Sequence, residues 1–263
     1  MRIKAETSSR LHAVAKVVLV TVGIFSWELT MAQSPQFSHE TLVDSGDTLR
    51  YRQLLSDYHD NAKYPLVIFL HGRGERGEDN EAQLKWGVRG FTTQRIMSTY
   101  KPIIIAPQCP DTTSWGGLTY DTPPSRGPLT TPMRLLLELI EHTIETLPVD
   151  SDRIYITGLS MGGFGTFDAL TRRPDLFAAA VPVCGGGDIS LAPSIAHIPM
   201  WIYHGALDSV VSPELSIEMH EALRRAGASP GLTIYPDTGH FAWIGAYADA
   251  LMMDWLFSQK KEK

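Results

Sequence analysis

Short apolar runs alternate with helical segments along most of the chain, and this alternation constrains the fold more than any other feature of the sequence. The strand-like runs occupy residues 65–70, 103–106, 153–157, 178–183, 200–203 and 232–235. Helical spacing of apolar side chains is found in residues 132–147, 161–173, 213–226 and 244–258. Strands that alternate with helices form a mostly parallel sheet with helices on both faces. The sequence therefore predicts an α/β fold.

A different pattern precedes these elements. Residues 39–57 alternate in polarity around Ser45-Gly46-Asp47, which predicts an antiparallel hairpin at the N-terminal side of the sheet. No repeat or linker divides the chain beyond residue 32, and its length allows one domain to bury a sizeable core. We expect residues 33–263 to form a single α/β domain.

Residues 1–32 have the pattern of a signal peptide. Four basic residues precede an apolar stretch over residues 17–27, which is shorter than the roughly 20 residues of a membrane span. Small residues at positions 30 and 32 predict cleavage after Ala32. The mature protein would then be secreted or periplasmic and have no membrane span. An uncleaved anchor is the alternative, because Glu28 lies close to the apolar stretch.

Charge and motif content exclude several classes of function. Lys and Arg total 23 against 29 Asp and Glu, and no basic block occurs outside the N-terminal region, whereas nucleic-acid binding needs clustered cations. No group of His, Cys and Asp has metal-ligand spacing, so we expect no metal. Residues 71–77 are glycine-rich, but they lack both phosphate-loop signatures. The sequence therefore predicts a protein that binds no nucleic acid and has neither a metal site nor a phosphate loop.

The motif with the most chemical content is Gly158-Leu159-Ser160-Met161-Gly162, between a β-branched strand and an amphipathic helix. Glycines two residues before and after the serine permit a tight turn that exposes the hydroxyl above the edge of the sheet. The helix that follows contributes free backbone N–H groups and the positive end of its dipole. We predict that Ser160 is a nucleophile; a helix-capping serine is the alternative.

A serine hydroxyl needs a base to remove its proton, and the base needs an acid to orient it. His240 follows the last predicted strand, and Asp208 follows the strand before it, which gives the order serine, acid, histidine of α/β-hydrolases. Asp188 and Asp237 are rival acids, because the first follows another strand and the second lies three residues before the histidine. The predicted triad is therefore Ser160, Asp208 and His240.

The reaction also needs backbone donors for the negative oxygen of a tetrahedral intermediate. We expect one to be the N–H of Met161, directly after the nucleophile, and the other to be the N–H of Arg73 in the glycine-rich loop of residues 71–77. A solvent-exposed turn with Arg and Glu pairs is the alternative for that loop.

Two cysteines, Cys109 and Cys184, each lie just beyond a strand-like run. In an oxidising compartment they could pair, since the ends of strands gather at one edge of a sheet. Two separate buried thiols are the alternative, and the sequence leaves both open.

Together these residues resemble the α/β-hydrolase superfamily, and more closely the secreted bacterial esterases often labelled predicted peptidases, akin to feruloyl-esterase and polyhydroxybutyrate-depolymerase-like hydrolases. The resemblance covers most of residues 60–258 and rests on Phe69-Leu70-His71-Gly72-Arg73-Gly74, Ala106-Pro107-Gln108-Cys109-Pro110 with Trp115, the motif around Ser160, Cys184-Gly185-Gly186-Gly187-Asp188, His204-Gly205 with Asp208, and Gly239-His240 with Trp243. It implies an eight-strand-type sheet, a Ser–Asp–His triad and no cofactor. It also implies that Gln108, Trp115 and Trp243 lie near the substrate, although the tryptophans could equally pack in the core.

The expected function is that of an exported serine hydrolase of carboxylic esters. Its substrates would carry small to medium acyl or aryl groups and could be linked to polysaccharide. A serine peptidase of small peptides with the same triad is one alternative. A catalytically silent exported binding protein is another, although such proteins typically lose a member of the triad, and all three residues are present here.

Overall fold

The computed structural model describes residues 36–55, 62–117 and 124–261. The predicted signal peptide, residues 1–32, lies outside these residues. Residues Pro35–Lys263 form one compact unit. None of the helices in the described part of the chain is both long and apolar enough to cross a membrane.

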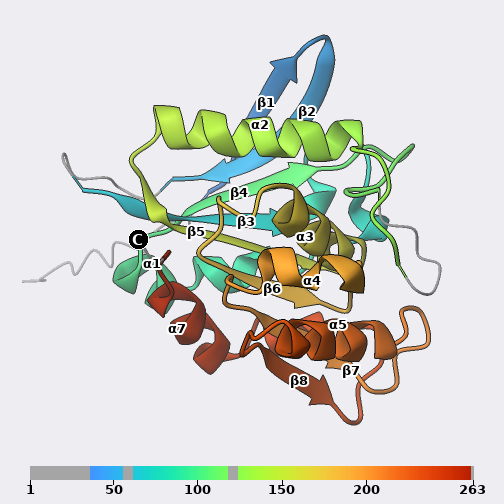
Figure 1. Cartoon of the computed structure of the whole chain (residues 1–263). Helices are drawn as coiled ribbons and strands as arrows, with labels where there is room; N and C mark the ends of the chain where they lie inside the picture. Colours follow the sequence, from blue (N-terminus) through green and yellow to red (C-terminus); the bar gives the residue numbers. More distant parts are fainter. Residues whose placement is uncertain (1–35, 56–61, 118–123, 262–263) are drawn as a thin grey trace, which may run out of the picture. The chain divides into compact units, whose positions relative to one another are not determined.

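One eight-stranded sheet organises this unit, in the order β1-β2-β4-β3-β5-β6-β7-β8 (Figure 1). Its strands are β1 (Ser38–Asp44), β2 (Asp47–Leu54), β3 (Tyr64–Leu70), β4 (Ile103–Gln108), β5 (Val149–Leu159), β6 (Ala179–Val183), β7 (Trp201–Gly205) and β8 (Gly231–Tyr235). β1 pairs antiparallel with β2, and β2 pairs antiparallel with β4. Every other pairing is parallel. The mostly parallel sheet and the N-terminal hairpin confirm the predicted fold.

Helices follow the strands along the chain. They are α1 (Gln94–Thr99), α2 (Thr131–Thr146), α3 (Met161–Arg172), α4 (Ala192–Ile195), α5 (Glu214–Arg225), α6 (Trp243–Ala246) and α7 (Ala250–Ser258). Short 3-10 turns add η1 (Arg73–Glu75), η2 (Ala82–Leu84), η3 (Val88–Thr92) and η4 (Ile189–Leu191). Thr130 caps α2 by accepting a hydrogen bond from the N–H of Met133, and Pro132 occupies its first turn.

Two hydrophobic cores lie on opposite faces of the sheet, because successive side chains of a strand point in opposite directions. In β3, Leu66, Ile68 and Leu70 pack with the helices α2, α3, α4 and α5. The intervening Val67 and Phe69 pack with α1, α6, α7 and two of the 3-10 turns. All five side chains are buried. The prediction of helices on both faces is therefore confirmed.

The structure differs from the sequence-based expectation at the last helix. Residues 244–258 were expected to form one helix, but α6 ends at Ala246 and α7 begins at Ala250. Asp249 separates the two, because its carboxylate accepts hydrogen bonds from the N–H groups of Leu251 and Met252 and so caps α7. The short turns between β3 and β4 were also not anticipated from the sequence.

The sheet places the candidate residues at one edge. Parallel strands have their carboxyl ends at the same edge of a sheet, where ligands of α/β proteins bind. The segments that leave β3, β5, β7 and β8 there begin at His71, Ser160, Ala206 and Pro236. Residues far apart in the sequence are thereby brought within reach of one another.

Candidate active site

Ser160 stands at the sharp turn between β5 and α3. Its φ of 54° lies in the left-handed region, which non-glycine residues rarely adopt. The flanking glycines are required by close packing, because a Cβ at Gly158 would collide with the carbonyl oxygen of Gly162, and one at Gly162 with that of Leu70. The N–H of Ser160 donates to Val183 O at 2.9 Å, which fixes the turn to the neighbouring strand.

The three residues of the predicted triad form a continuous hydrogen-bond chain. Ser160 Oγ lies 2.9 Å from His240 Nε2, and His240 Nδ1 lies 2.7 Å from Asp208 Oδ2. These are the contacts that a base needs in order to accept the serine proton and be held by a carboxylate. The arrangement can therefore support nucleophilic attack by the serine hydroxyl.

The two rival acids lie elsewhere. Asp188 is the N-cap of η4, and its carboxylate accepts hydrogen bonds from the N–H groups of Ser190 and Arg126. Asp237 is an exposed residue of the turn before His240. Among the described residues, Asp208 is thus the carboxylate that contacts the histidine.

Asp208 is buried but remains suited to carry a negative charge. Burial alone would raise the pKa of its carboxyl group, but hydrogen bonds from His240 and from the N–H groups of Val211 and Val210 outweigh burial and lower the pKa below its usual value. Both amides donate to Oδ1 at 2.9 Å, which leaves Oδ2 to face the histidine.

Met161 and Arg73, whose N–H groups are the predicted oxyanion donors, both line the cavity that contains Ser160. Met161 is the first residue of α3 and Arg73 is the first residue of η1, so neither amide has a partner within its own helix. Within the described residues, neither donates a backbone hydrogen bond. Both are therefore free to bind an anionic oxygen.

His71 holds the loop that carries Arg73. Its Nδ1 donates to Gly72 O at 2.6 Å, while its Nε2 accepts a hydrogen bond from the N–H of Cys109 at 2.9 Å. Burial lowers the pKa of His71 to about 4, which keeps the ring in the neutral form that this pattern requires. Trp115 Nε1 donates to His71 O at 3.0 Å and thereby ties a third segment to the loop.

Two of the three residues expected near the substrate serve the loop instead. Gln108 is buried, and its amide donates to Glu75 O at 3.1 Å and to Asp79 Oδ1 at 2.8 Å. Trp115 is fully buried against the ring of His71. Neither is among the residues that line the cavity, and both are hydrogen-bonded to the loop that carries Arg73. The alternative of core packing holds for Trp115.

Trp243 does line the cavity. Its ring packs edge-on against that of His240, with 5.0 Å between the ring centroids. The imidazole is thereby held from the side as well as by Asp208. A role of Trp243 in substrate binding stays a prediction.

The cavity has a volume of about 720 Å³, within the roughly 300–1,000 Å³ typical of small-molecule sites. Apolar side chains form one part of its lining, namely Met161, Phe164, Val210, Val211 and Leu215. Another part contains Arg73, Glu75, Lys85 and the ring of Trp86, which lies edge-on to Phe241. Sequence reasoning did not single out Glu75, Lys85, Trp86 or Phe241, although Phe241 directly follows the predicted base.

Cys109 and Cys184 are two free, buried thiols. The proposed disulfide is absent because Cys109 follows β4 and Cys184 follows β6, and both β3 and β5 lie between these strands. Three strand spacings separate the two by about 14 Å, twice the reach of a disulfide. The alternative of separate buried thiols is therefore correct. Burial raises the pKa of each to about 12.

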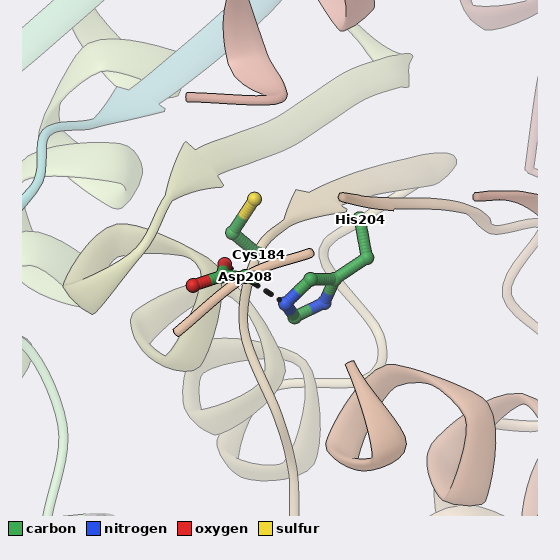
Figure 2. A group of neighbouring side chains, drawn as sticks. All are labelled: Cys184, His204 and Asp208. Atoms are coloured by element: carbon green, nitrogen blue, oxygen red, sulfur yellow. Dashed lines mark ion pairs between the residues drawn. The ribbon is translucent and has the colours of Figure 1, made fainter. Parts of the chain in front are cut away.

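Cys184, His204 and Asp208 form the group in the described residues that comes closest to a metal site (Figure 2). One ligand-type atom of each lies within 4.8 Å of the others. All three already have protein partners, however. The Cys184 thiol donates to His240 O, Asp208 accepts from His240, and both ring nitrogens of His204 are hydrogen-bonded. The donor set thus serves the triad rather than a cation.

Comparison with known proteins identifies the family of the chain and shows similarity to several esterases and to a dipeptidyl-peptidase. A family model described as phospholipase/carboxylesterase matches residues 58–251. Acyl-protein thioesterase 1 of Neurospora crassa is 28% identical over 205 residues, which cover 68% of this chain and 80% of that protein. A bifunctional acetylxylan esterase/xylanase of Neocallimastix patriciarum is 22% identical over 148 residues, which cover 56% of this chain but 20% of that protein.

The similar solved structures include esterases, and they also include acylaminoacyl peptidases. A thermostable esterase superposes with a TM-score of 0.80 at 36% identity, over 86% of this chain and 63% of that one. A ferulic acid esterase superposes with a TM-score of 0.66 at 18% identity, over 85% and 98% of the two chains, and this likeness shows the fold alone. The chain therefore spans less than two thirds of the thermostable esterase and of the bifunctional enzyme.

Proposed function

The chain belongs to the phospholipase/carboxylesterase family, and we propose that it is a serine hydrolase of carboxylic esters that acts through an acyl-enzyme on Ser160. The observation that carries this proposal is the hydrogen-bond chain from Ser160 through His240 to Asp208. In support of the proposal, Ser160 lies in a cavity that is also lined by Met161 and Arg73, whose backbone N–H groups have no backbone acceptor among the described residues.

The first half of the reaction forms the acyl-enzyme. His240 takes the hydroxyl proton of Ser160, and Ser160 Oγ attacks the ester carbonyl carbon. The carbonyl oxygen becomes negative and accepts hydrogen bonds from the N–H groups of Met161 and Arg73. His240 then gives the proton to the leaving alcohol, and the carbon–oxygen bond to that alcohol breaks.

The second half regenerates the enzyme. Water enters the position of the alcohol, His240 takes its proton, and the hydroxide attacks the acyl carbon. The same two amides bind the second oxyanion. Collapse of this intermediate returns the proton from His240 to Ser160 Oγ and releases the carboxylic acid. Asp208 stays ionised throughout, as its lowered pKa favours.

Substrates of this enzyme are small to medium acyl or aryl esters. A cavity of about 720 Å³ with an apolar part and an aromatic pair, Trp86 and Phe241, supports groups of that size. Esters linked to polysaccharide are included in the proposal, supported by the likeness to an acetylxylan esterase. The signal-peptide pattern of residues 1–32 supports a secreted or periplasmic location.

Mass spectrometry after treatment with a fluorophosphonate tests the nucleophile. We expect one adduct, on the peptide that contains Ser160, and none in Ser160→Ala. That variant should also lower kcat on an aryl acetate by about 10⁴-fold or more. Ser194→Ala, which removes an exposed hydroxyl on α4, is the matched control and should keep full activity. Folded protein that takes up no label would contradict the proposal.

A panel of aryl esters and matching amides tests the bond that is cleaved. We expect ester turnover with amide turnover at least about 100-fold slower. Faster cleavage of the amides would make the protein a peptidase with the same triad. Binding of esters without any turnover would make it a silent binding protein.

A further inference from the structure

His204 is a fully buried histidine for which the reaction above has no use. It lies near the end of β7, and its Nε2 is 3.2 Å from Asp208 Oδ2, the same oxygen that accepts the hydrogen bond from His240. Figure 2 shows the ring directed at the Asp208 carboxylate. A second imidazole therefore contacts the acid of the triad from inside the protein.

Its hydrogen-bond partners define where the ring carries its hydrogen. Nε2 faces Val211 O at 3.0 Å as well as the Asp208 carboxylate, and both are acceptors only, so Nε2 must be a donor. Nδ1 lies 2.7 Å from Ser216 Oγ, whose hydroxyl also has Gly185 O within 3.0 Å. Burial lowers the pKa of His204, which favours the neutral ring with its one hydrogen on Nε2. Nδ1 and Gly185 O are then both acceptors for the single hydroxyl hydrogen of Ser216.

The carboxylate of Asp208 thus has donors on both oxygens. Two backbone amides donate to Oδ1 and His240 donates to Oδ2. The Nε2 of His204, whose hydrogen bond goes to Val211 O at 3.0 Å, lies 3.2 Å from Oδ2 as a further contact. A buried carboxylate is stable only when its oxygens are hydrogen-bonded, and each donor also restricts its rotation. The Cys184 thiol also faces this carboxylate, so His204 is one of two buried groups beside it, in addition to His240.

We propose that His204 is a positioning residue of the triad, which donates from Nε2 to Asp208 and so holds Oδ2 in place for His240. Ser216 of α5 in turn orients the ring of His204 through Nδ1. The chain of hydrogen bonds then runs from α5 through β7 to the catalytic serine. This inference rests on the proposed function, because it assigns a role within that reaction.

Two substitutions of similar size separate this role from a merely structural one. His204→Leu removes the donor, whereas His204→Gln keeps an N–H that can reach the carboxylate. We expect kcat on an aryl acetate to fall about 10- to 100-fold in His204→Leu, which is the value of one hydrogen bond to a charged group, while KM changes less than about twofold. In His204→Gln, kcat should stay within about threefold of the wild type.

The pH profile adds a readout that packing alone would not move. A carboxylate with one donor fewer holds the imidazolium form of its partner more strongly, so the acid limb of kcat/KM should move to higher pH in His204→Leu. Thr143→Val, which removes a buried hydroxyl that bonds Leu139 O in α2, is the control for lost stability and should move neither kcat nor the limb. The proposal would be overturned if kcat fell equally in the Leu and Gln variants, in proportion to their loss of stability, and if the acid limb of the pH profile did not move.

Failure of the proposed function would be recognised separately. If the wild type neither cleaves esters nor reacts with the fluorophosphonate, the low-field proton resonance of the Asp208–His240 hydrogen bond tests His204 directly. We expect this resonance to shift or broaden in His204→Leu and to be unchanged in His204→Gln and Thr143→Val. An unaltered resonance in His204→Leu would overturn the role of His204 whatever the activity of the protein.

Discussion

His71 shows how a single buried residue can link the pH of the solution to the stability of this protein. The ring is almost fully buried, and burial lowers its pKa from 6.5 to about 4. The unfolded chain therefore binds a proton near pH 6.5, whereas the folded protein does not bind it until about pH 4. Stability contributed by the neutral ring is complete above pH 6.5 and is lost progressively as the pH falls toward 4.

We expect this residue to reduce the free energy of unfolding by about 3 kcal/mol between pH 6.5 and 4, since each pKa unit corresponds to about 1.4 kcal/mol. His71→Asn should lack that contribution, so urea unfolding curves should show the wild type and the variant converging as the pH falls. His142→Asn, at an exposed position of α2, is the control and should follow the wild type in parallel. If the free energies of unfolding of His71→Asn and of the wild type changed with pH in parallel, the ring of His71 would not be held neutral in the folded protein.

At the scale of elements, the loop that carries Arg73 is held by buried side chains of its neighbours. Gln108 joins Glu75 O, Asp79 and the N–H of Asn80. Gln108→Leu leaves these groups unpaired, and we expect it to lower the free energy of unfolding by about 1–3 kcal/mol. Because the Arg73 amide loses its fixed position, kcat on an aryl acetate should fall by about tenfold with little change in KM.

Gln83→Leu is the matched control for this prediction. Gln83 is also a buried amide, and it bonds Asn80 Oδ1 without contacting the Arg73 loop. We expect it to cost stability but to leave kcat within about twofold of the wild type. Equal losses of kcat in both variants would show that general loosening, rather than the loop, slows the reaction.

The sequence predicted the elements whose pattern is local and regular. Strands such as β3 and the turn at Ser160 were readable because an apolar run or a pair of glycines has one common structural meaning. The roles of Gln108 and Trp115 could not be predicted from the sequence. Whether a residue lines the cavity or supports its wall depends on contacts between residues that are 28 or more positions apart in the chain. The break between α6 and α7 depended on a single cap, Asp249, inside a segment of helical composition.

At the scale of the whole molecule, exposed apolar side chains gather on the segments that carry Asp208 and His240. Of the large hydrophobic side chains that are exposed in the described residues, four lie close in sequence to Asp208 or His240. They are Leu207, Val210 and Phe241 in the loops and Ile244 in α6, with exposed fractions of 65%, 71%, 54% and 59%. Val210 and Phe241 also line the cavity. Apolar surface concentrated beside an active site is typical of a binding surface.

This rim should bind the part of an ester that extends beyond the cavity. We expect Val210→Ser together with Phe241→Ser to lower kcat/KM about 10-fold for long-chain acyl or bulky aryl esters, because each side chain loses about 0.7 kcal/mol of contact. An acetyl ester, which does not reach the rim, should change less than about twofold. Leu251→Ser, at an equally exposed position of α7 outside the cavity lining, is the control and should affect neither substrate. If kcat/KM fell equally for short and long esters, the rim would instead support the two loops that carry Asp208 and His240. The preference for ester length would then depend on the cavity alone.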